Sequence, residues 1–246
     1  MKLVDVGGRR LAVWTRGAGQ PAVVFETGLG ATAAEWAPVQ DAVSERASTV
    51  RYDRANCGES DAAEKPRSSL DMARDLHAML HAAEVPAPYV LVAHSFGGPI
   101  CLTYARHYLD EVAGLVLADA THPEQFDTFA AALPDFLAEM KQFWSTGWRS
   151  TTSTPEGVDF LTSFEQLSDL PPLGDRPLMI LTSTTWNIAG PEAVQWQERW
   201  ERMQRGWLTL SRVAEQRTVP DTDHFLQRGA PAAITEGVLW VLDRIA

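Results

Sequence analysis

The chain has few of the features that tie a protein to a membrane or a nucleic acid. No apolar run in its 246 residues approaches the roughly 18–20 residues of a membrane span, and residues 1–5 form no apolar signal region. Acidic residues outnumber basic ones, 32 to 21, for a net charge of −11, and no basic block is longer than Arg9-Arg10. We therefore expect neither a membrane nor a nucleic acid as a partner.

Cysteine is also scarce. Cys57 and Cys101 make no disulfide framework, which is typical of the reducing cytoplasm. The spacing of these cysteines and of the six histidines offers no metal cluster, and His77, His81 and His107 fall on expected helices as ordinary helix residues. Neither a P-loop nor a G-x-G-x-x-G motif occurs. We predict a cytoplasmic protein that needs no metal and no cofactor.

Short apolar runs alternate with helical patterns along most of the chain. The runs expected as strands are 3–6, 11–15, 22–26, 49–52, 89–93, 112–118, 178–182 and 215–219. Helices are expected at 36–44, 69–83 (with Ser69 as its cap), 99–105, 191–210 and from 230 onward. Apolar strands joined by helices indicate the α/β class, with a mostly parallel, doubly wound sheet covered by helices on both faces.

The alternation is interrupted after residue 121. Residues 122–175 show no clear strand pattern and contain many phenylalanines and tryptophans. We interpret this stretch as a small helical cap inserted into the fold, with residues 1–121 and 176–246 forming the two parts of the core domain. The cap aromatics could line a substrate site or simply pack on one another, and the sequence favours neither.

One strand ends in a turn that is typical of a catalytic serine. The apolar run 89–93 stops at His94-Ser95, two glycines follow at 97 and 98, and a helix pattern begins. A serine between a strand and a helix, with small neighbours, is the context of a nucleophile elbow. The motif is A-H-S-F-G, so Ala93 stands where such elbows usually carry glycine, and Gly97 holds the second small position.

A serine nucleophile needs a base and an orienting acid, in the chain order serine, acid, histidine. His224 follows the last strand in a loop and fits the base. Asp119 closes the strand 112–118 at its carboxyl end, 24 residues after Ser95, and is our predicted acid. Asp221 and Asp223 remain alternatives because they lie close to His224 in sequence.

The more usual position for the acid, after strand 178–182, has no carboxylate. The turn reads Ser183-Thr184-Thr185-Trp186-Asn187-Ile188, and Glu192 is expected in the next helix. This absence is a further reason to place the acid at residue 119.

A tetrahedral oxyanion needs two backbone N–H donors. The elbow supplies that of Phe96. The loop Thr27-Gly28-Leu29-Gly30 follows the strand 22–26, and its glycines let the backbone turn toward the serine, so we predict Leu29 as the second donor.

Together these motifs resemble those of the α/β-hydrolase superfamily. The resemblance rests on F-E-T-G-L-G at 25–30, Y-D-R at 52–54 with G-E-S at 58–60, the elbow, L-A-D at 117–119 and D-H-F at 223–225. It implies a capped serine hydrolase in which Ser95 is the nucleophile and His224 the base. Some branches of the family, among them certain lactone hydrolases, carry the acid where Asp119 stands. The resemblance also implies that Asp53 is structural.

We predict a serine hydrolase that cleaves an ester or lactone of an apolar or aromatic small molecule. The residues expected to contact substrate are Gly28, Trp36, His122, Trp144 and Trp186. Alternatives are an amidase, thioesterase or acyltransferase with the same triad, and a non-catalytic ligand-binding protein. The tryptophans and methionine at 196, 200, 203 and 207 repeat at helical spacing and predict a packing face, against the core, the cap or a second subunit of a homodimer.

Overall fold

The computed structural model describes residues 1–126, 128, 142, 146–150, 154–185 and 192–245. An eight-stranded sheet has the order β1-β2-β4-β3-β5-β6-β7-β8. Its strands are β1 (Lys2–Asp5), β2 (Arg10–Arg16), β3 (Ala22–Glu26), β4 (Thr49–Tyr52), β5 (Tyr89–His94), β6 (Val112–Ala118), β7 (Leu178–Ser183) and β8 (Ala214–Val219). β1 and β2 form an antiparallel hairpin, β2 pairs antiparallel with β4, and all pairs from β4 to β8 are parallel.

Helices connect the strands. The α-helices with described bounds are α1 (Ala37–Val43), α2 (Ser69–Ala82), α3 (Gly97–His107), α6 (Phe160–Glu165), α7 (Glu192–Gly206), α8 (Leu226–Gly229) and α9 (Pro231–Leu242). Short 3-10 helices are η1 (Ala33–Trp36), η2 (Leu109–Glu111), η4 (Gly147–Arg149) and η5 (Trp207–Leu210). Within the described ranges, every helix is too short or too polar to cross a lipid bilayer.

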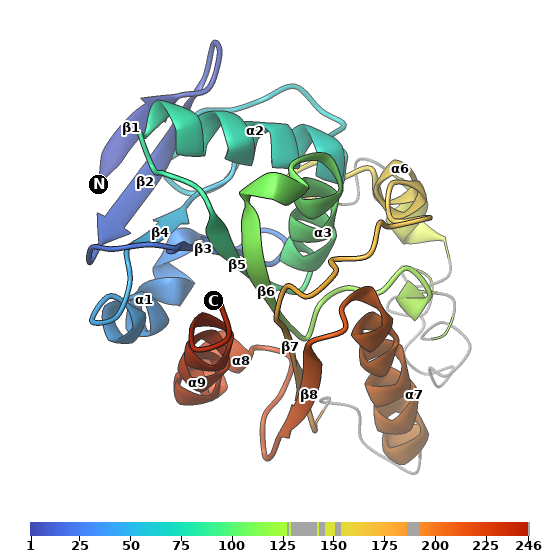
Figure 1. Ribbon diagram of the computed structural model, residues 1–246. Helices are drawn as coiled ribbons and strands as arrows, with labels where there is room; N and C mark the ends of the chain where they lie inside the picture. Colours follow the sequence, from blue (N-terminus) through green and yellow to red (C-terminus); the bar gives the residue numbers. More distant parts are fainter. Residues whose placement is uncertain (127, 129–141, 143–145, 151–153, 186–191, 246) are drawn as a thin grey trace.

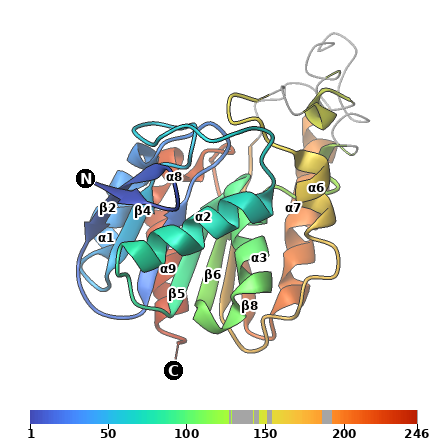
Figure 2. The ribbon, with the colours of Figure 1, turned by 90° about the horizontal axis from the view of Figure 1, so that it is seen from above.

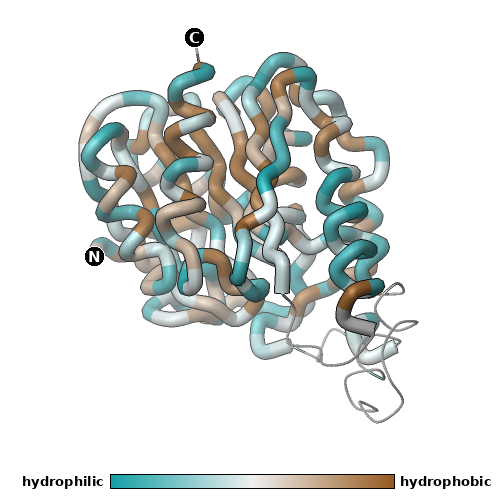
Figure 3. The backbone as a smooth tube through the Cα atoms, turned by 90° about the horizontal axis from the view of Figure 1, so that it is seen from below, coloured by the Kyte–Doolittle hydropathy of each residue, from teal (hydrophilic) through white to brown (hydrophobic). Residues whose placement is uncertain are grey.

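The central strands β3, β5 and β7 are buried on both faces. Figure 1 shows α2 and α3 on one face and α1 and α9 on the other, and Figure 2 shows the same layers from above. Alternate residues of β5 enter different clusters: Leu91 packs with the α2 and α3 side chains, whereas Val90 and Val92 pack with α1 and α9. The hydropathy colouring in Figure 3 accordingly shows largely hydrophobic strands at the centre.

The observed architecture confirms the α/β class and the doubly wound sheet. One local expectation was wrong. Ser68, not Ser69, caps α2, because its Oγ accepts the Asp71 N–H while the Asp71 carboxylate accepts the Ser68 N–H. Between the loop of His224 and α9 the chain forms the short helix α8, where no element was expected. The division into core and cap stays a prediction; the described part of 122–175 contains η4 and α6.

Candidate active site

The turn after β5 holds Ser95 in a conformation that most residues avoid. Its φ is +52°, in the left-handed region. The Ser95 N–H donates to the Ala118 carbonyl at 3.2 Å, and its own carbonyl accepts the N–H of Gly98 at 2.9 Å. A Cβ on Gly97 would come within 2.7 Å of the Glu26 carbonyl oxygen, so only glycine fits there. The strain and the close approach project the Ser95 side chain from the carboxyl edge of the sheet.

Three side chains from that edge form one hydrogen-bonded chain. The Oγ of Ser95 lies 2.9 Å from His224 Nε2, and His224 Nδ1 lies 3.1 Å from Asp119 Oδ2. A carboxylate only accepts hydrogen bonds, so Nδ1 carries the proton and Nε2 is free to accept from the serine hydroxyl. Ser95, Asp119 and His224 follow β5, β6 and β8 respectively, and the parallel strands bring them together.

Asp119 is fully buried, and its carboxylate is surrounded by donors. Oδ1 accepts the Ser183 N–H at 2.8 Å and the Trp200 Nε1–H at 2.9 Å. Oδ2 accepts the Ser183 hydroxyl at 2.6 Å in addition to His224. These bonds hold the charge in a place where an unpaired carboxylate would be costly. The end of β7 is where many such enzymes would carry the triad acid. Here its last residue, Ser183, instead donates two hydrogen bonds to Asp119.

The rival carboxylates make different contacts. Asp223 Oδ1 accepts the N–H of Phe225 at 2.9 Å and so stabilises the loop that carries His224. Asp221 is exposed, with a φ of +54°. The geometry therefore favours Asp119 as the partner of His224 Nδ1.

The loop after β3 lies against the elbow. A Cβ on Gly28 would come within 2.8 Å of His94 Nδ1 and 3.2 Å of Ser95 Cβ, so the glycine allows this approach. Among the described residues, neither the Leu29 N–H nor the Phe96 N–H has a hydrogen-bond acceptor. Two backbone donors beside the serine hydroxyl are thus available to a ligand.

A buried arginine fixes that loop. The Arg54 guanidinium donates to the carbonyls of Thr27 and Gly28, both at 2.7 Å. It also pairs with Glu26 at 2.6 Å and with Glu156 at 2.7 Å. All three charged side chains are at most 3% exposed. Glu156 Oε1 in turn accepts the Gly30 N–H, so the loop is held from both ends.

The charges of this cluster shift one another's pKa values. Burial opposes ionisation of Glu156, but the charge of Arg54 and the hydrogen bonds from Arg54 and the Gly30 N–H together outweigh it, so the pKa of that carboxyl lies below its ordinary value. Burial dominates at Glu26, whose pKa is raised despite the arginine.

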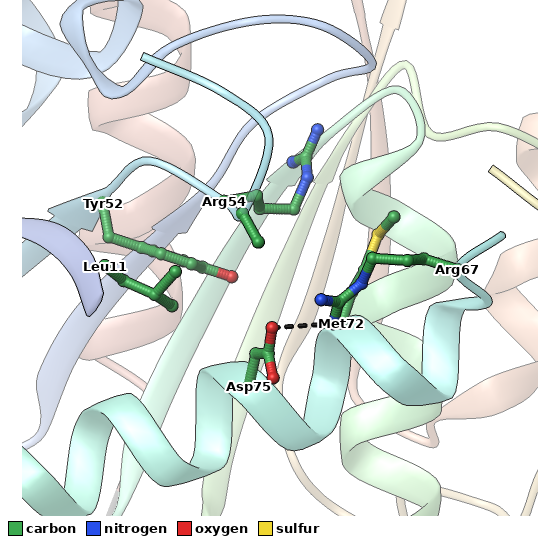
Figure 4. Close-up of a pocket in the computed structure, with 7 residues that line it drawn as sticks. Leu11, Tyr52, Arg54, Arg67, Met72 and Asp75 are labelled. Carbon is green, nitrogen blue, oxygen red and sulfur yellow. Dashed lines mark hydrogen bonds and ion pairs between the residues drawn. The ribbon is translucent and has the colours of Figure 1, made fainter. Parts of the chain in front are cut away.

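Figure 4 shows Tyr52 and Arg54 beside a cavity of about 10 Å³, with the Arg54 guanidinium directed away from Asp75. That volume holds about one water molecule and excludes a substrate.

His94, which precedes the nucleophile, supports the base. Its Nε2 lies 2.7 Å from the His224 carbonyl oxygen and must be the donor, because a carbonyl only accepts. The two imidazole rings are 4.7 Å apart. Burial, and then the neighbouring His224, lower the pKa of His94 well below its ordinary range. This contact gives His94 a definite hydrogen-bonding partner.

A neutral buried histidine makes stability depend on pH. As the pH falls below 6.5, the ordinary pKa of histidine, the unfolded chain takes up a proton that folded His94 does not bind. Its contribution to stability is present above pH 6.5 and is lost below it. We expect wild type to lose unfolding free energy faster than His94→Gln between pH 6.5 and about pH 5, as measured by urea titration. The exposed His107→Gln should follow wild type; parallel curves for all three proteins would contradict this role.

Two residues expected to contact substrate make other contacts in the structure. Trp36 is fully buried in η1 with its ring 5.3 Å from that of Phe25, so it belongs to the core and not to the site rim. His122 is half-buried: its Nδ1 accepts the Glu124 N–H at 3.2 Å and its ring packs 4.7 Å from Trp207. These contacts close a turn and fill a packing face, and the contact of His122 with substrate stays a prediction. Trp144 and Trp186 lie outside the described residues.

The described aromatic residues between 122 and 175 pack together. Phe126 and Trp148 stack at 4.6 Å with an interplanar angle of 8°, and Phe126 lies edge-on to Phe160 at 5.2 Å. Phe160 also contacts Phe96, the residue after the nucleophile, at 5.1 Å. These rings therefore pack on one another, which is one of the two alternatives that the sequence left open. The cluster contacts the nucleophile elbow through Phe96.

One apolar side chain at the site was not expected from the sequence. Phe225 is 41% exposed and its ring lies 5.5 Å from that of His224. Arg228 covers it at 4.6 Å. In the sequence, Phe225 is recognisable only as an apolar residue directly after the base. Its exposure beside the His224 imidazole makes Phe225 a candidate contact for a bound molecule.

Residues 21–143, half of the chain, match the family model described as alpha/beta hydrolase fold. The chain belongs to the α/β-hydrolase family. It is similar to the uncharacterized protein YqjL of Bacillus subtilis, with 25% identity over 217 residues, covering 88% of this chain and 81% of YqjL.

Solved structures share the fold at lower sequence identity. A thermophilic esterase from Thermogutta terrifontis aligns with a TM-score of 0.69 and 19% identity over 100% of this chain and 99% of the esterase. The enol-lactonase from Burkholderia xenovorans LB400 aligns with a TM-score of 0.71 and 18% identity over 98% and 100% of the two chains.

Proposed function

We propose that this protein is a serine hydrolase that cleaves carboxylic esters or lactones through an acyl-enzyme. The observation that carries the proposal is the chain Ser95 Oγ to His224 Nε2 at 2.9 Å and His224 Nδ1 to Asp119 Oδ2 at 3.1 Å. A nucleophile within hydrogen-bond reach of a base, which a third group orients, is the arrangement that activates a weak hydroxyl.

In the first half of the reaction, Ser95 Oγ attacks the carbonyl carbon of the substrate. His224 Nε2 takes the serine proton, and buried Asp119 stabilises the imidazolium that forms. The imidazolium then gives this proton to the leaving alkoxide, which departs as an alcohol. In the second half, His224 deprotonates a water molecule that attacks the acyl-enzyme, and proton return to Ser95 restores the hydroxyl.

The tetrahedral intermediate of each half carries a negative oxygen. The N–H groups of Phe96 and Leu29 are the proposed donors to it, because both lie beside the nucleophile without an acceptor among the described residues. Removing one such donor typically costs roughly 10²–10³ in rate. Apart from the substrate and one water molecule, the groups that react or stabilise charge in this scheme belong to the protein.

The substrate class is argued from the surroundings of the serine. Phe96 joins the elbow to an apolar aromatic cluster, and Phe225 exposes its ring beside the base. Apolar walls beside the nucleophile favour an apolar or aromatic small molecule. The names of two structural neighbours, an esterase and an enol-lactonase, support ester and lactone substrates.

A panel of substrates tests this proposal. We expect the full chain to hydrolyse p-nitrophenyl esters and aromatic lactones, and Ser95→Ala to lower kcat by at least roughly 10⁴ while remaining folded. Parallel reactions with an aryl amide, a thioester and added methanol or amine separate amidase, thioesterase and acyltransferase activity. Equal rates for wild type and Ser95→Ala on every compound would refute the proposal and favour a ligand-binding protein.

A further inference from the structure

Three potential metal ligands meet on the surface, away from the catalytic serine. His77 Nε2 and His81 Nε2 lie 3.2 Å and 3.1 Å from the same oxygen, Oε1 of Glu111. The ligand atoms of all three residues lie within 4.8 Å of one another. The sequence predicted no metal cluster because Glu111 stands 30 residues after His81, beyond any local spacing.

The fold places these groups on two adjacent elements. His77 and His81 are four residues apart on α2, so both project from the same face of that helix. Glu111 ends η2, which connects α3 to β6, and α2 packs beside α3 (Figure 2). A bound ion would therefore join α2 to the α3–β6 connection.

Neighbouring tyrosines orient two of the three ligands. The Tyr104 hydroxyl donates to Oε2 of Glu111 and leaves Oε1 directed at the histidines. The Tyr108 ring stacks on His77 at 4.0 Å with an interplanar angle of 13°. Partners that hold ligands in place are a regular feature of metal sites, and their loss usually weakens binding. Here both ligands have such a partner before any ion binds.

We propose that His77, His81 and Glu111 form a site for a divalent transition-metal ion, with Zn²⁺ as the preferred ion. Zinc bonds of 2.0–2.2 Å in tetrahedral geometry place neighbouring ligand atoms roughly 3.3 Å apart, and the observed nitrogen–oxygen separations match this spacing. Two imidazoles and one carboxylate suit Zn²⁺ better than Mg²⁺ or Ca²⁺, which prefer oxygen ligands. Water completes the fourth position.

The position of the site makes its role structural. Glu111 immediately precedes β6 and Asp119 immediately follows it, so the metal site and the catalytic residues lie at opposite ends of this strand, roughly 25 Å apart. An ion there stabilises the folded state because the unfolded chain does not assemble the three ligands. It takes no part in the reaction at Ser95.

Calorimetric titration of the untagged, chelator-treated full chain with ZnCl₂ at pH 7.5 tests the proposal. We expect one saturable site per chain and a rise in Tm of about 5–10 °C at a free zinc concentration near 100 times Kd. His81→Gln and Glu111→Gln should each weaken binding at least tenfold, and Tyr104→Phe should weaken it severalfold. His81 is 56% exposed, so its substitution leaves the fold intact.

His107→Gln is the matched control, because this exposed histidine ends α3 without joining the cluster. Its zinc affinity should equal that of wild type, and ester hydrolysis should be unchanged in His81→Gln. Absence of a saturable site in wild type would overturn the proposal and leave two histidines hydrogen-bonded to Glu111. Unchanged affinity in His81→Gln, or equal weakening in His107→Gln, would overturn it as well.

Discussion

Asp119→Asn is expected to lower kcat/KM for ester hydrolysis by about 10⁴. Oδ1 of Asp119 accepts the Ser183 and Trp200 N–H groups, so the amide oxygen of asparagine would occupy that position. Its NH₂ group would then face His224 Nδ1 and force that nitrogen to accept. The proton would move to Nε2, which could no longer accept the proton of Ser95.

The substitution isolates this effect because asparagine tolerates the backbone of residue 119, whose φ is +47°. Circular dichroism should show an unchanged fold. Asp221→Asn and Asp223→Asn are matched controls in the loop of His224, and both should keep activity close to that of wild type. If Asp119→Asn stays active while either control collapses, the acid has been assigned to the wrong residue.

Replacing Arg54 by methionine should destabilise the folded protein strongly. The change leaves Glu26 and Glu156 buried without the cation that both contact, and an unpaired buried charge typically costs about 3–5 kcal/mol. Urea unfolding of the full chain, followed by circular dichroism, measures this loss. We also expect lower kcat in the folded fraction, because Arg54 holds the carbonyls of Thr27 and Gly28 next to the proposed oxyanion donor.

Arg46→Met provides the control for this experiment. Arg46 pairs with Asp243, and both side chains are 57% exposed, so losing the pair should change the unfolding free energy by less than about 1 kcal/mol. A loss for Arg54→Met as small as that for Arg46→Met would show that the buried cluster does not stabilise the loop.

The strands and the residues that follow them could be predicted from the sequence. Strands buried on both faces read as short apolar runs, and all parallel strands end at the same edge. Ser95 and Asp119 stand directly after two such strands, so their place at the same edge of the sheet could be predicted. The observed pairing of His94 with Ala118 at the ends of β5 and β6 brings these two segments side by side.

Other features depend on contacts that sequence spacing does not reveal. Arg54 and Glu156 are 102 residues apart, and Glu156 lies in a stretch with no periodic pattern. Trp36 was expected to contact substrate, but the turn of η1 directs its ring onto Phe25 in the core. Long-range pairing of charges and the direction of one side chain both follow from tertiary packing, which a single sequence does not contain.

Covalent labelling of Ser95 tests the proposed nucleophile most directly. We predict that a fluorophosphonate adds one phosphonyl group per chain, that peptide mapping places it on Ser95, and that Ser95→Ala stays unlabelled. Labelling of His224→Ala and Asp119→Asn should be slower by orders of magnitude, because both lack a correctly oriented base. A folded wild-type protein that resists the reagent, or that carries the group on another residue, would contradict the serine-hydrolase mechanism.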